Sequence, residues 1–401
     1  MPNPREVLST DAQQALQFLS SFQDSSGNFN VDQIKQARLT KISELRQLKT
    51  EFAEQQASWR ASLHPAVRSV IGHVQLPLLQ KLASNFSYPD MGALIQFSEG
   101  HPLIGEVPCG GNLTPKEFIA DSSVADLGAT ARARQKAVQE RVLKWGTTMM
   151  LRDPQVVHGG YQKTMAEIEA GTLGHLYDTL DEIAFALGCH PDDICLTPRE
   201  TIEQKHHSER GMIAKKRNID DMKMGGQNET VSMHETYVPK NNTDLAVWHK
   251  ALRSIFGDSI PLALWGTDFE GWYRQHANRP DSHRFAVLCF YDPFRKCLRY
   301  TVAWGVCFGS KPASLNCSRV LRVLTFLAAR LFGIYGIDCT DDVNACEPKQ
   351  TAPSALLAWK TFAGDIIGFR FEGSKHGLGT SLVIQGVLVD AAGRELLALS
   401  R

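Results

Sequence analysis

The stretch Ile334–Glu347 reads IYGIDCTDDVNACE and places two adjacent acids, Asp341 and Asp342, between two mainly apolar segments. This order predicts a β-hairpin that presents the acid pair at its tip. Adjacent carboxylates repel each other, and a divalent metal ion is the usual group that neutralises such a pair. On its own, an Asp-Asp pair is also typical of a solvent-exposed turn, where Asp forms local hydrogen bonds with the backbone.

A third acid makes the metal-binding interpretation more specific. Asp268 ends another apolar segment, Leu262–Asp268, which reads LALWGTD. If the two segments are neighbouring strands, three carboxylates meet and can hold two metal ions, as in nucleotidyl transfer. We therefore expect Asp268, Asp341 and Asp342 to bind two Mg²⁺ ions, with Mn²⁺ as the alternative.

The composition indicates a folded protein with a substantial core. The chain has 401 residues, 43% of them hydrophobic, which is enough for two or three subdomains. The most apolar long segment, Val320–Ile337, is interrupted by Arg322 and Arg330, so it predicts a buried helix followed by a strand rather than a membrane span. The amino terminus lacks the apolar core of a signal peptide. We expect an intracellular protein of the nucleus or cytoplasm that is not secreted and has no membrane partner.

The charge distribution leaves the class of ligand open. The 43 basic residues balance the 43 acidic ones, whereas nucleic-acid-binding proteins usually carry a basic excess. Basic residues nevertheless gather between Lys205 and Arg217, which suits either a groove for phosphates or a solvated charged loop. The nine cysteines include no Cys-x-x-Cys pair, so we expect reduced structural thiols and no zinc finger.

The periodicity of apolar residues predicts an α+β fold. Helical spacing occupies residues 1–85, 122–151 and 161–187, and Gly171 is a suitable helix stop. Later segments predict strands at 285–291 and 298–304 with a turn at 292–295, then the acid hairpin, a helix near 355–363, and strands at 366–371, 382–390 and 395–399. Because the strands and helices follow no regular βαβ repeat, we expect an antiparallel sheet with helices on one face.

Several short motifs follow one another along the chain. They are Arg217–Asp221 (RNIDD), Asp268–Gln275 (DFEGWYRQ), Phe308–Ser314 (FGSKPAS), Cys339–Asp342 (CTDD), Gly368-Phe369 with Lys375, and Gln385-Gly386. In this order and spacing, the chain resembles the reverse transcriptases of retroelements, especially the divergent polymerases abundant in protist genomes, over residues 88–390. The resemblance implies a helical N-terminal region (1–85), a fingers-like region (86–260) and a palm domain with the catalytic acids (261–401).

The resemblance also implies roles for the acids. Asp268 and Asp341 would each bind both metal ions, assisted by the carbonyl of Phe269, and Asp342 would be the neighbouring, less essential acid. Tyr273 would lie under the sugar of the incoming nucleotide and exclude a 2′-hydroxyl group. Without the resemblance, Tyr273 would be read as an ordinary core aromatic.

The remaining motifs are implied to hold substrate. Arg217 would grip the triphosphate, with Lys215 or Lys216 making further phosphate contacts. The loop at Phe308 and Gly309 would lie against nucleotide and template. Two further sets would serve catalysis and primer binding: Lys375 as general acid for the leaving pyrophosphate, and Gln385 with Gly386 at the primer.

The resemblance implies an RNA-directed DNA polymerase of a retrotransposon, which takes deoxynucleoside triphosphates and an RNA or DNA template with a DNA primer. The N-terminal helices would contact another protein or a second copy. Some positions depart from the family: Cys339 replaces the usual aromatic residue, and the chain ends where a thumb and a ribonuclease H would follow. Two alternatives stay open, namely a non-catalytic nucleic-acid-binding remnant of this fold and a helical scaffold protein without a polymerase site, in which Asp268 and Asp341 would lie far apart.

Overall fold

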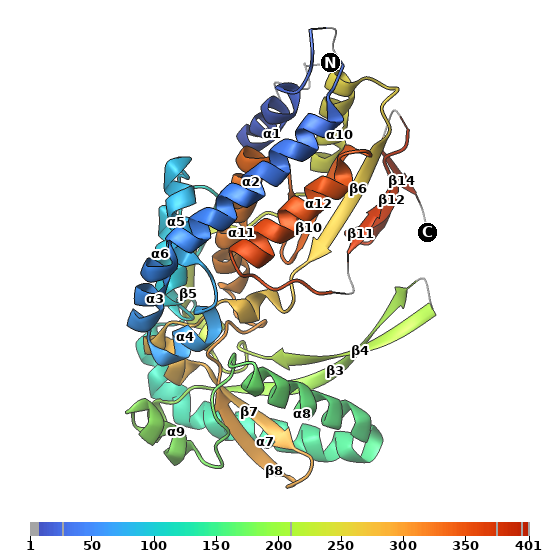
Figure 1. Ribbon diagram of the computed structural model, residues 1–401. Helices are drawn as coiled ribbons and strands as arrows, with labels where there is room; N and C mark the ends of the chain where they lie inside the picture. The colour runs from blue at the N-terminus through green and yellow to red at the C-terminus, as the bar shows by residue number, and fades with distance from the viewer. Residues whose placement is uncertain (1–7, 26–27, 209–210, 374–375, 394–395, 400–401) are drawn as a thin grey trace.

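The computed structural model describes residues 8–25, 28–208, 211–373, 376–393 and 396–399 (Figure 1). The helices are α1 (Thr10–Ser20), α2 (Val31–Glu51), α3 (Ala53–Ser62), α4 (Pro65–Ile71), α5 (Leu76–Asn85), α6 (Met91–Glu99), α7 (Val124–Arg152), α8 (Pro154–Glu169), α9 (Leu180–Leu187), α10 (Asn242–Phe256), α11 (Ala313–Phe332) and α12 (Ala352–Lys360). A π-helical turn (Thr361–Ile366) extends α12, and short 3₁₀ turns include Trp272–Gln275. Among these residues, no helix combines the length and apolar character that crossing a membrane requires.

The strands form four small sheets rather than the one expected. The strands are β1 (Gly105–Glu106), β2 (Thr114–Phe118), β3 (Leu196–Ser208), β4 (Gly211–Asp220), β5 (Val231–Thr236), β6 (Leu262–Asp268), β7 (Val287–Asp292), β8 (Cys297–Val302), β9 (Ile337–Cys339), β10 (Asp342–Pro348), β11 (Gly377–Gly379), β12 (Ser381–Ile384), β13 (Val387–Asp390) and β14 (Leu397–Leu399). Their orders are β1-β5-β2, β11-β6-β10-β9, β12-β13-β14 and β4-β3-β7-β8. Pairing is mostly antiparallel, as predicted, but β1–β5 and β3–β7 are parallel pairs.

The sheet that carries the acids is covered on both faces, which corrects the expectation of helices on one face. In β6, Trp265 belongs to a core shared with α11 and α12, whereas Leu264 belongs to a second core with α1 and α10. Successive side chains of a strand point to opposite faces, so the two cores lie on opposite sides of the sheet. Helix α12 packs against β6, and α10 packs against the neighbouring strand β10 (Figure 1). Burial on both faces explains why LALWGTD is almost continuously apolar.

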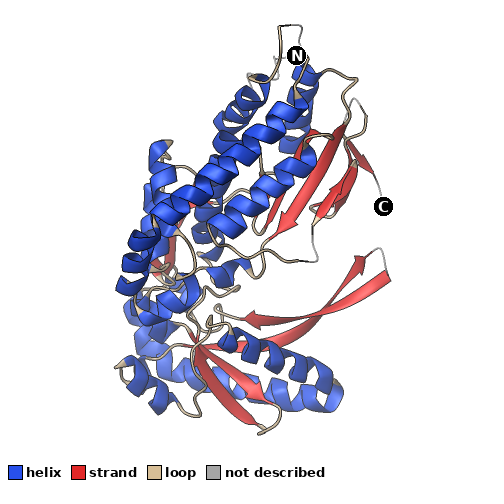
Figure 2. Ribbon diagram, viewed as in Figure 1, coloured by secondary structure: helices blue, strands red, loops and turns tan. Residues whose placement is uncertain are grey.

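The other large sheet stands apart from the acid-bearing one. Helices α7 and α8 pack against β3 and β7, and the β3–β4 hairpin extends towards the acid-bearing half (Figure 2). The hairpin is tied to α8 by Asn218, whose amide donates to the carbonyl oxygen of Gly160 at 3.1 Å and to the hydroxyl of Thr164 at 3.2 Å. These bonds fix the base of the hairpin on the helix.

The N-terminal helices are joined to the acid-bearing sheet by a buried ion pair. Arg38 of α2 donates two hydrogen bonds to Glu347 of β10, at 2.8 and 3.3 Å, and a third to the carbonyl oxygen of Phe332 at 3.0 Å. Both side chains are almost fully buried, at 1% and 3% exposure. A bidentate Arg–carboxylate pair of this kind fixes orientation as well as proximity.

Local predictions near the C-terminus were partly wrong. The apolar run 366–371, expected as a strand, is the end of the π-helical turn and a loop in which Phe371 forms one isolated bridge with Phe269. The segment 382–390 is two strands, because Gln385 and Gly386 both have positive φ angles and form a two-residue turn between Ile384 and Val387. The turn at 292–295 and the stop at Gly171 (φ +72°) are confirmed.

Candidate functional site

The acid pair lies on a tight hairpin beside the end of β6. Cys339 pairs with Asp342, which leaves Thr340 and Asp341 as the two-residue turn between β9 and β10. Asp342 is the register partner of Asp268. The amide of Phe269 donates to the carbonyl oxygen of Asp341 at 2.9 Å, so the backbone joins the hairpin tip to the end of β6.

The three carboxylates converge. One oxygen from each of Asp268, Asp341 and Asp342 lies within 4.8 Å of the others, and the part of the chain that the structure describes holds no second such group of acids, cysteines and histidines. Asp268 is 3% exposed and the other two are half-buried. Ligand oxygens on opposite sides of one Mg²⁺ ion lie ~4.2 Å apart, so this donor set fits hard divalent cations. The alternative of a helical scaffold without a polymerase site required Asp268 and Asp341 to lie far apart, and they do not.

Negative potential from this cluster reaches a neighbouring thiol. Burial, followed by the charges of Asp342, Asp341 and Asp338, raises the pKa of Cys339 above its ordinary value. A cation bound between the acids would reduce this effect. The thiol at position 339 therefore stays protonated at neutral pH and packs as a small hydrophobic group.

The turn that presents Asp341 has an unfavourable backbone conformation. Thr340 has a φ of +60°, in the left-handed region that β-branched residues rarely adopt. Such a conformation costs on the order of 1–3 kcal/mol and persists only where surrounding bonds enforce it. Here the Phe269–Asp341 bond and a bond from the Thr340 amide to the Tyr237 hydroxyl at 3.3 Å hold the turn.

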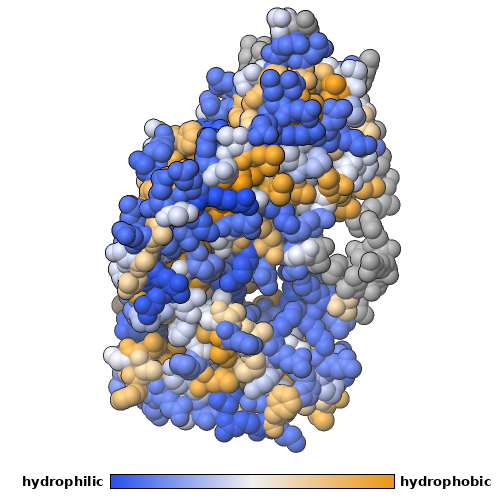
Figure 3. Space-filling model, in the orientation of Figure 1, coloured by the Kyte–Doolittle hydropathy of each residue, from blue (hydrophilic) through white to orange (hydrophobic). Residues whose placement is uncertain are grey.

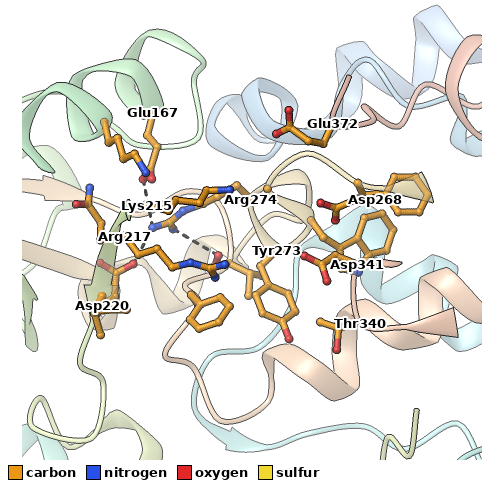
Figure 4. Close-up of a pocket in the computed structure, with 18 of the residues that line it drawn as sticks. Glu167, Lys215, Arg217, Asp220, Asp268, Tyr273, Arg274, Thr340, Asp341 and Glu372 are labelled. Atoms are coloured by element: carbon orange, nitrogen blue, oxygen red, sulfur yellow. Dashed lines mark hydrogen bonds and ion pairs between the residues drawn. The ribbon is translucent and has the colours of Figure 1, made fainter. Parts of the chain in front are cut away.

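Cations face the acids across a cleft of about 580 Å³ (Figure 4). Lys215 and Arg217 of β4 and Lys163 of α8 line it on one side, and the three acids line it on the other. Partial burial, followed by the charges of Lys215 and Arg217, lowers the pKa of Lys163. The cleft thus carries acidic side chains on one wall and cationic side chains on the other.

Lys216, the other lysine predicted to contact phosphate, points away from this cleft. Its ammonium group donates to the carbonyl oxygen of Gln155 at 2.7 Å, at the start of α8. Alternation along a strand explains the difference, since Lys215 and Arg217 share one face of β4 and Lys216 lies on the other.

A buried ionic network forms the floor of the cleft. Asp220 accepts hydrogen bonds from Arg199 at 2.6 Å and from Arg274 at 2.7 Å, and both arginines also reach Glu167, at 2.9 and 3.3 Å. Although burial acts in the opposite direction, the two guanidinium groups lower the pKa of Asp220 to about 2. Asp221, the last residue of the RNIDD motif, pairs with Arg141 at 3.0 Å nearer the surface.

Two aromatic side chains separate the cations from the acids. Tyr273 is partly buried and Phe308 is 58% exposed, and their ring centres lie 5.6 Å apart. Burial raises the pKa of the Tyr273 hydroxyl, which is therefore neutral. Gly309 lies outside the cleft: a Cβ atom there would lie 1.8 Å from the carbonyl oxygen of Asp220, so its close approach is to the protein backbone.

The other predicted site residues fall in three places. Phe269 lines the cleft, and its ring stacks on Phe371 with centres 4.5 Å apart. Gln385 and Gly386 form the β12–β13 turn outside the cleft, where the side-chain amide of Gln385 donates to the carbonyl oxygen of Lys240 at 2.6 Å. Lys375 lies outside the described residues. The roles assigned to all these residues stay predictions.

No role was predicted from the sequence for several residues of the cleft. They are Lys163, Glu167, Asp220, Arg274, Thr340 and Glu372. Asp220 and Arg274 stand inside motifs that the sequence singled out, so the signal was present and only the role was missed. Lys163 and Glu167 come from an ordinary amphipathic helix, and only the packing of α8 on the β3–β4 hairpin brings them here.

No protein-family model and no curated protein matches this chain. Among solved structures, the chain is similar to the foamy viral protease-reverse transcriptase in complex with dsDNA, at a TM-score of 0.39 and 12% identity over 61% of this chain and 42% of that one. The same enzyme with an RNA/DNA hybrid gives a TM-score of 0.38 and 12% identity, over 60% of this chain and 27% of that one. The chain thus spans less than half of each protein. A similarity of this size does not establish what the chain does.

Proposed function

We propose that this chain is a template-directed nucleotidyltransferase, an RNA-directed DNA polymerase of retroelement type. The proposal rests on one observation above all: three carboxylates converge within 4.8 Å and face Lys215 and Arg217 across one cleft. Nucleotidyl transfer needs both halves, because a hydroxyl group must be activated while a triphosphate is held and its charge neutralised. The ordered sequence motifs support the same assignment.

In the proposed mechanism, Asp268, Asp341 and Asp342 would hold two divalent cations. Bound there, the cations would supply acidification of a primer 3′-hydroxyl group and neutralisation of the leaving pyrophosphate. The fork of donors on Arg217 and the ammonium groups of Lys215 and Lys163 orient the triphosphate. Tyr273, between the two sets, supports the sugar, and its neutral hydroxyl avoids repulsion with phosphate. The partners are deoxynucleoside triphosphates and a DNA primer on an RNA or DNA template.

Three finer parts of the proposal are separate expectations. The division into a helical region (1–85), a fingers-like region (86–260) and a palm (261–401) stays a prediction. Lys375 as general acid and Gln385 with Gly386 as primer contacts also stay predictions. The N-terminal helices are proposed to contact another protein or a second copy.

The test is extension of a DNA primer on an RNA template with Mg²⁺. We expect wild-type incorporation and at least a ~10³-fold loss in Asp341→Asn, given the size of electrostatic contributions at such sites. Asp32→Asn is the matched control, because that side chain is 91% exposed on α2 and far along the chain from the cleft. Its activity should equal the wild type. Template binding with no incorporation by any variant would instead support the non-catalytic remnant.

A further inference from the structure

A second groove lies on the N-terminal helices, away from the acids. It measures about 850 Å³ and is lined by residues of α2, α3 and the end of α4. Lys49, Arg60, Arg68 and His73 contribute to it, and no carboxylate side chain does. Over these helices the visible face is mainly hydrophilic (Figure 3).

The cations of this groove are not neutralised by neighbours. Arg60 and Arg68 are exposed, and within the described ranges neither guanidinium group forms an ion pair or hydrogen bond. The Lys49 ammonium group donates one hydrogen bond, to the carbonyl oxygen of Asp365 at 2.6 Å. Partial burial lowers the pKa of His73 to about 4, and the charges of Arg370 and Arg60 act in the same direction.

The spacing of the charges suits a chain of phosphates better than a single anion. Lys49 and Arg60 are eleven residues apart on consecutive helices, up to ~16 Å along the axis. One strand of a nucleic-acid helix carries one phosphate per ~3.4 Å of helix axis, so more than one phosphate of a strand falls within this length. Inorganic phosphate would reach only one or two of the cations.

A short loop connects this groove with the acid cluster. The Gln75 amide donates to the carbonyl oxygen of Ile367 at 2.7 Å, and Gly368 (φ +106°) lies so close to His73 that a Cβ atom would be 2.7 Å from its carbonyl oxygen. Five residues after Ile367, the Glu372 amide donates to the carbonyl oxygen of Asp268 at 2.8 Å. An extended chain of that length spans at most ~18 Å, so one strand can reach both places.

We propose that this groove binds the phosphate backbone of a nucleic-acid strand, independently of base sequence and as a second contact surface beside the cleft. Arg60 and Arg68 supply the charge, and Gln56 and Gln75 form the polar wall. The inference concerns binding alone and does not depend on catalysis.

The experiment is fluorescence anisotropy with a labelled 15-nucleotide single-stranded RNA across a series of KCl concentrations. Arg60→Gln/Arg68→Gln should weaken binding about 10-fold at 100 mM salt and reduce the slope of log K against log salt by ~1.4, at 0.7 per contact. Arg132→Gln/Lys136→Gln removes two cations that are each 81% exposed on α7 and should stay within two-fold of the wild type. Arg60→Lys/Arg68→Lys keeps the charge and should bind nearly as well as the wild type, which guards against a folding artefact.

Two results would overturn the inference. One is equal weakening by the groove pair and the α7 pair, since that would reflect net charge only. The other is displacement of the RNA by polyglutamate as effectively as by unlabelled RNA at equal charge, which would make the groove a surface for acidic protein. A chain that binds RNA through the groove but extends no primer contradicts the proposed function and leaves this inference standing.

Discussion

Arg274 donates a 2.7 Å hydrogen bond to Asp220, joining the segment after β6 to the last residue of the β3–β4 hairpin. The same guanidinium group reaches the carbonyl oxygen of Gly305 at 3.0 Å and the carboxylate of Glu167 at 3.3 Å. One buried side chain therefore links the hairpin that carries the cationic wall to the segment that follows Asp268.

Replacing this arginine should be costly. Arg274→Gln removes one of the two guanidinium groups that neutralise the carboxylates of Asp220 and Glu167. Removal of one partner of a buried ion pair costs about 3–5 kcal/mol of stability. Arg295→Gln breaks a 2.8 Å pair with Asp178 whose side chains are 55% and 47% exposed, and should cost under ~1 kcal/mol. Urea unfolding of both variants gives the comparison. Equal losses would show that the network contributes no more than a surface pair.

Metal binding can be measured apart from activity. Wild-type protein should bind Mn²⁺ in electron paramagnetic resonance titrations, and Asp341→Asn should weaken that binding by at least ~10-fold because it removes one charged ligand. Asp32→Asn should bind as the wild type does. If all three proteins bind Mn²⁺ equally, the convergent acids are not the site.

The loop after β8 provides a test of close packing. Gly309→Ala would place a methyl group 1.8 Å from the carbonyl oxygen of Asp220, and should lower the free energy of unfolding by more than ~2 kcal/mol. Gly128→Ala is the matched control: position 128 lies inside α7 with nothing within 4 Å, so alanine should stabilise by ~0.5–1 kcal/mol. Thermal unfolding measures both. Two changes of the same sign would contradict the geometry.

The hairpin turn makes a prediction about strain. Thr340→Gly should raise stability by ~1 kcal/mol, because glycine adopts a φ of +60° without steric cost but loses more chain entropy on folding. Thr340→Ala keeps a Cβ atom and should bring no such gain. Denaturant midpoints at equal m-values test this, and a gain in the alanine variant would attribute the effect to the hydroxyl group instead.

Two buried histidines predict a pH dependence. His101 and His276 lie 3.1 Å apart, and burial lowers the pKa of His101 to about 3 and that of His276 well below its ordinary value. Unfolded histidines bind protons below pH ~6.5, so the free energy of unfolding should fall as pH drops from 6.5 towards 3, by up to ~1.4 kcal/mol per pH unit for each histidine. Urea unfolding at pH 7.5 and 5 measures the slope. His101→Gln should reduce it, and an unchanged slope would refute the assignment.

Sequence patterns correctly predicted those turns and helix ends that depend on residues within the same short segment. The turn at 292–295 follows from Asp292 and Pro293, and the α8 boundary from Gly171, since these residues restrict their own backbone. The prediction of a strand at 366–371 was wrong because a short, mainly apolar stretch suits a buried helix end as well as a strand. The β3–β4 hairpin was missed because its charged positions hide the alternation of a strand.

The convergence of the acids could not follow from spacing. Asp268 and Asp342 are register partners across 74 residues, and only the pairing of β6 with β10 brings them together. The motif resemblance anticipated this pairing, whereas nothing in the sequence indicated that Lys163 would join the cationic wall. Contacts between helices and strands that are distant in the chain determine where such side chains lie, and local periodicity gives no information about these contacts.

The bidentate bond from Arg38 to Glu347 restricts which substitutions can accumulate at these two positions during evolution. A lineage that lost the first helices would leave the carboxylate of Glu347 buried without its arginine partner, in the strand that begins at Asp342. A substitution of Arg38 or Glu347 requires a compensating substitution of the other residue. The two positions should therefore vary together among relatives, even though 309 positions separate them.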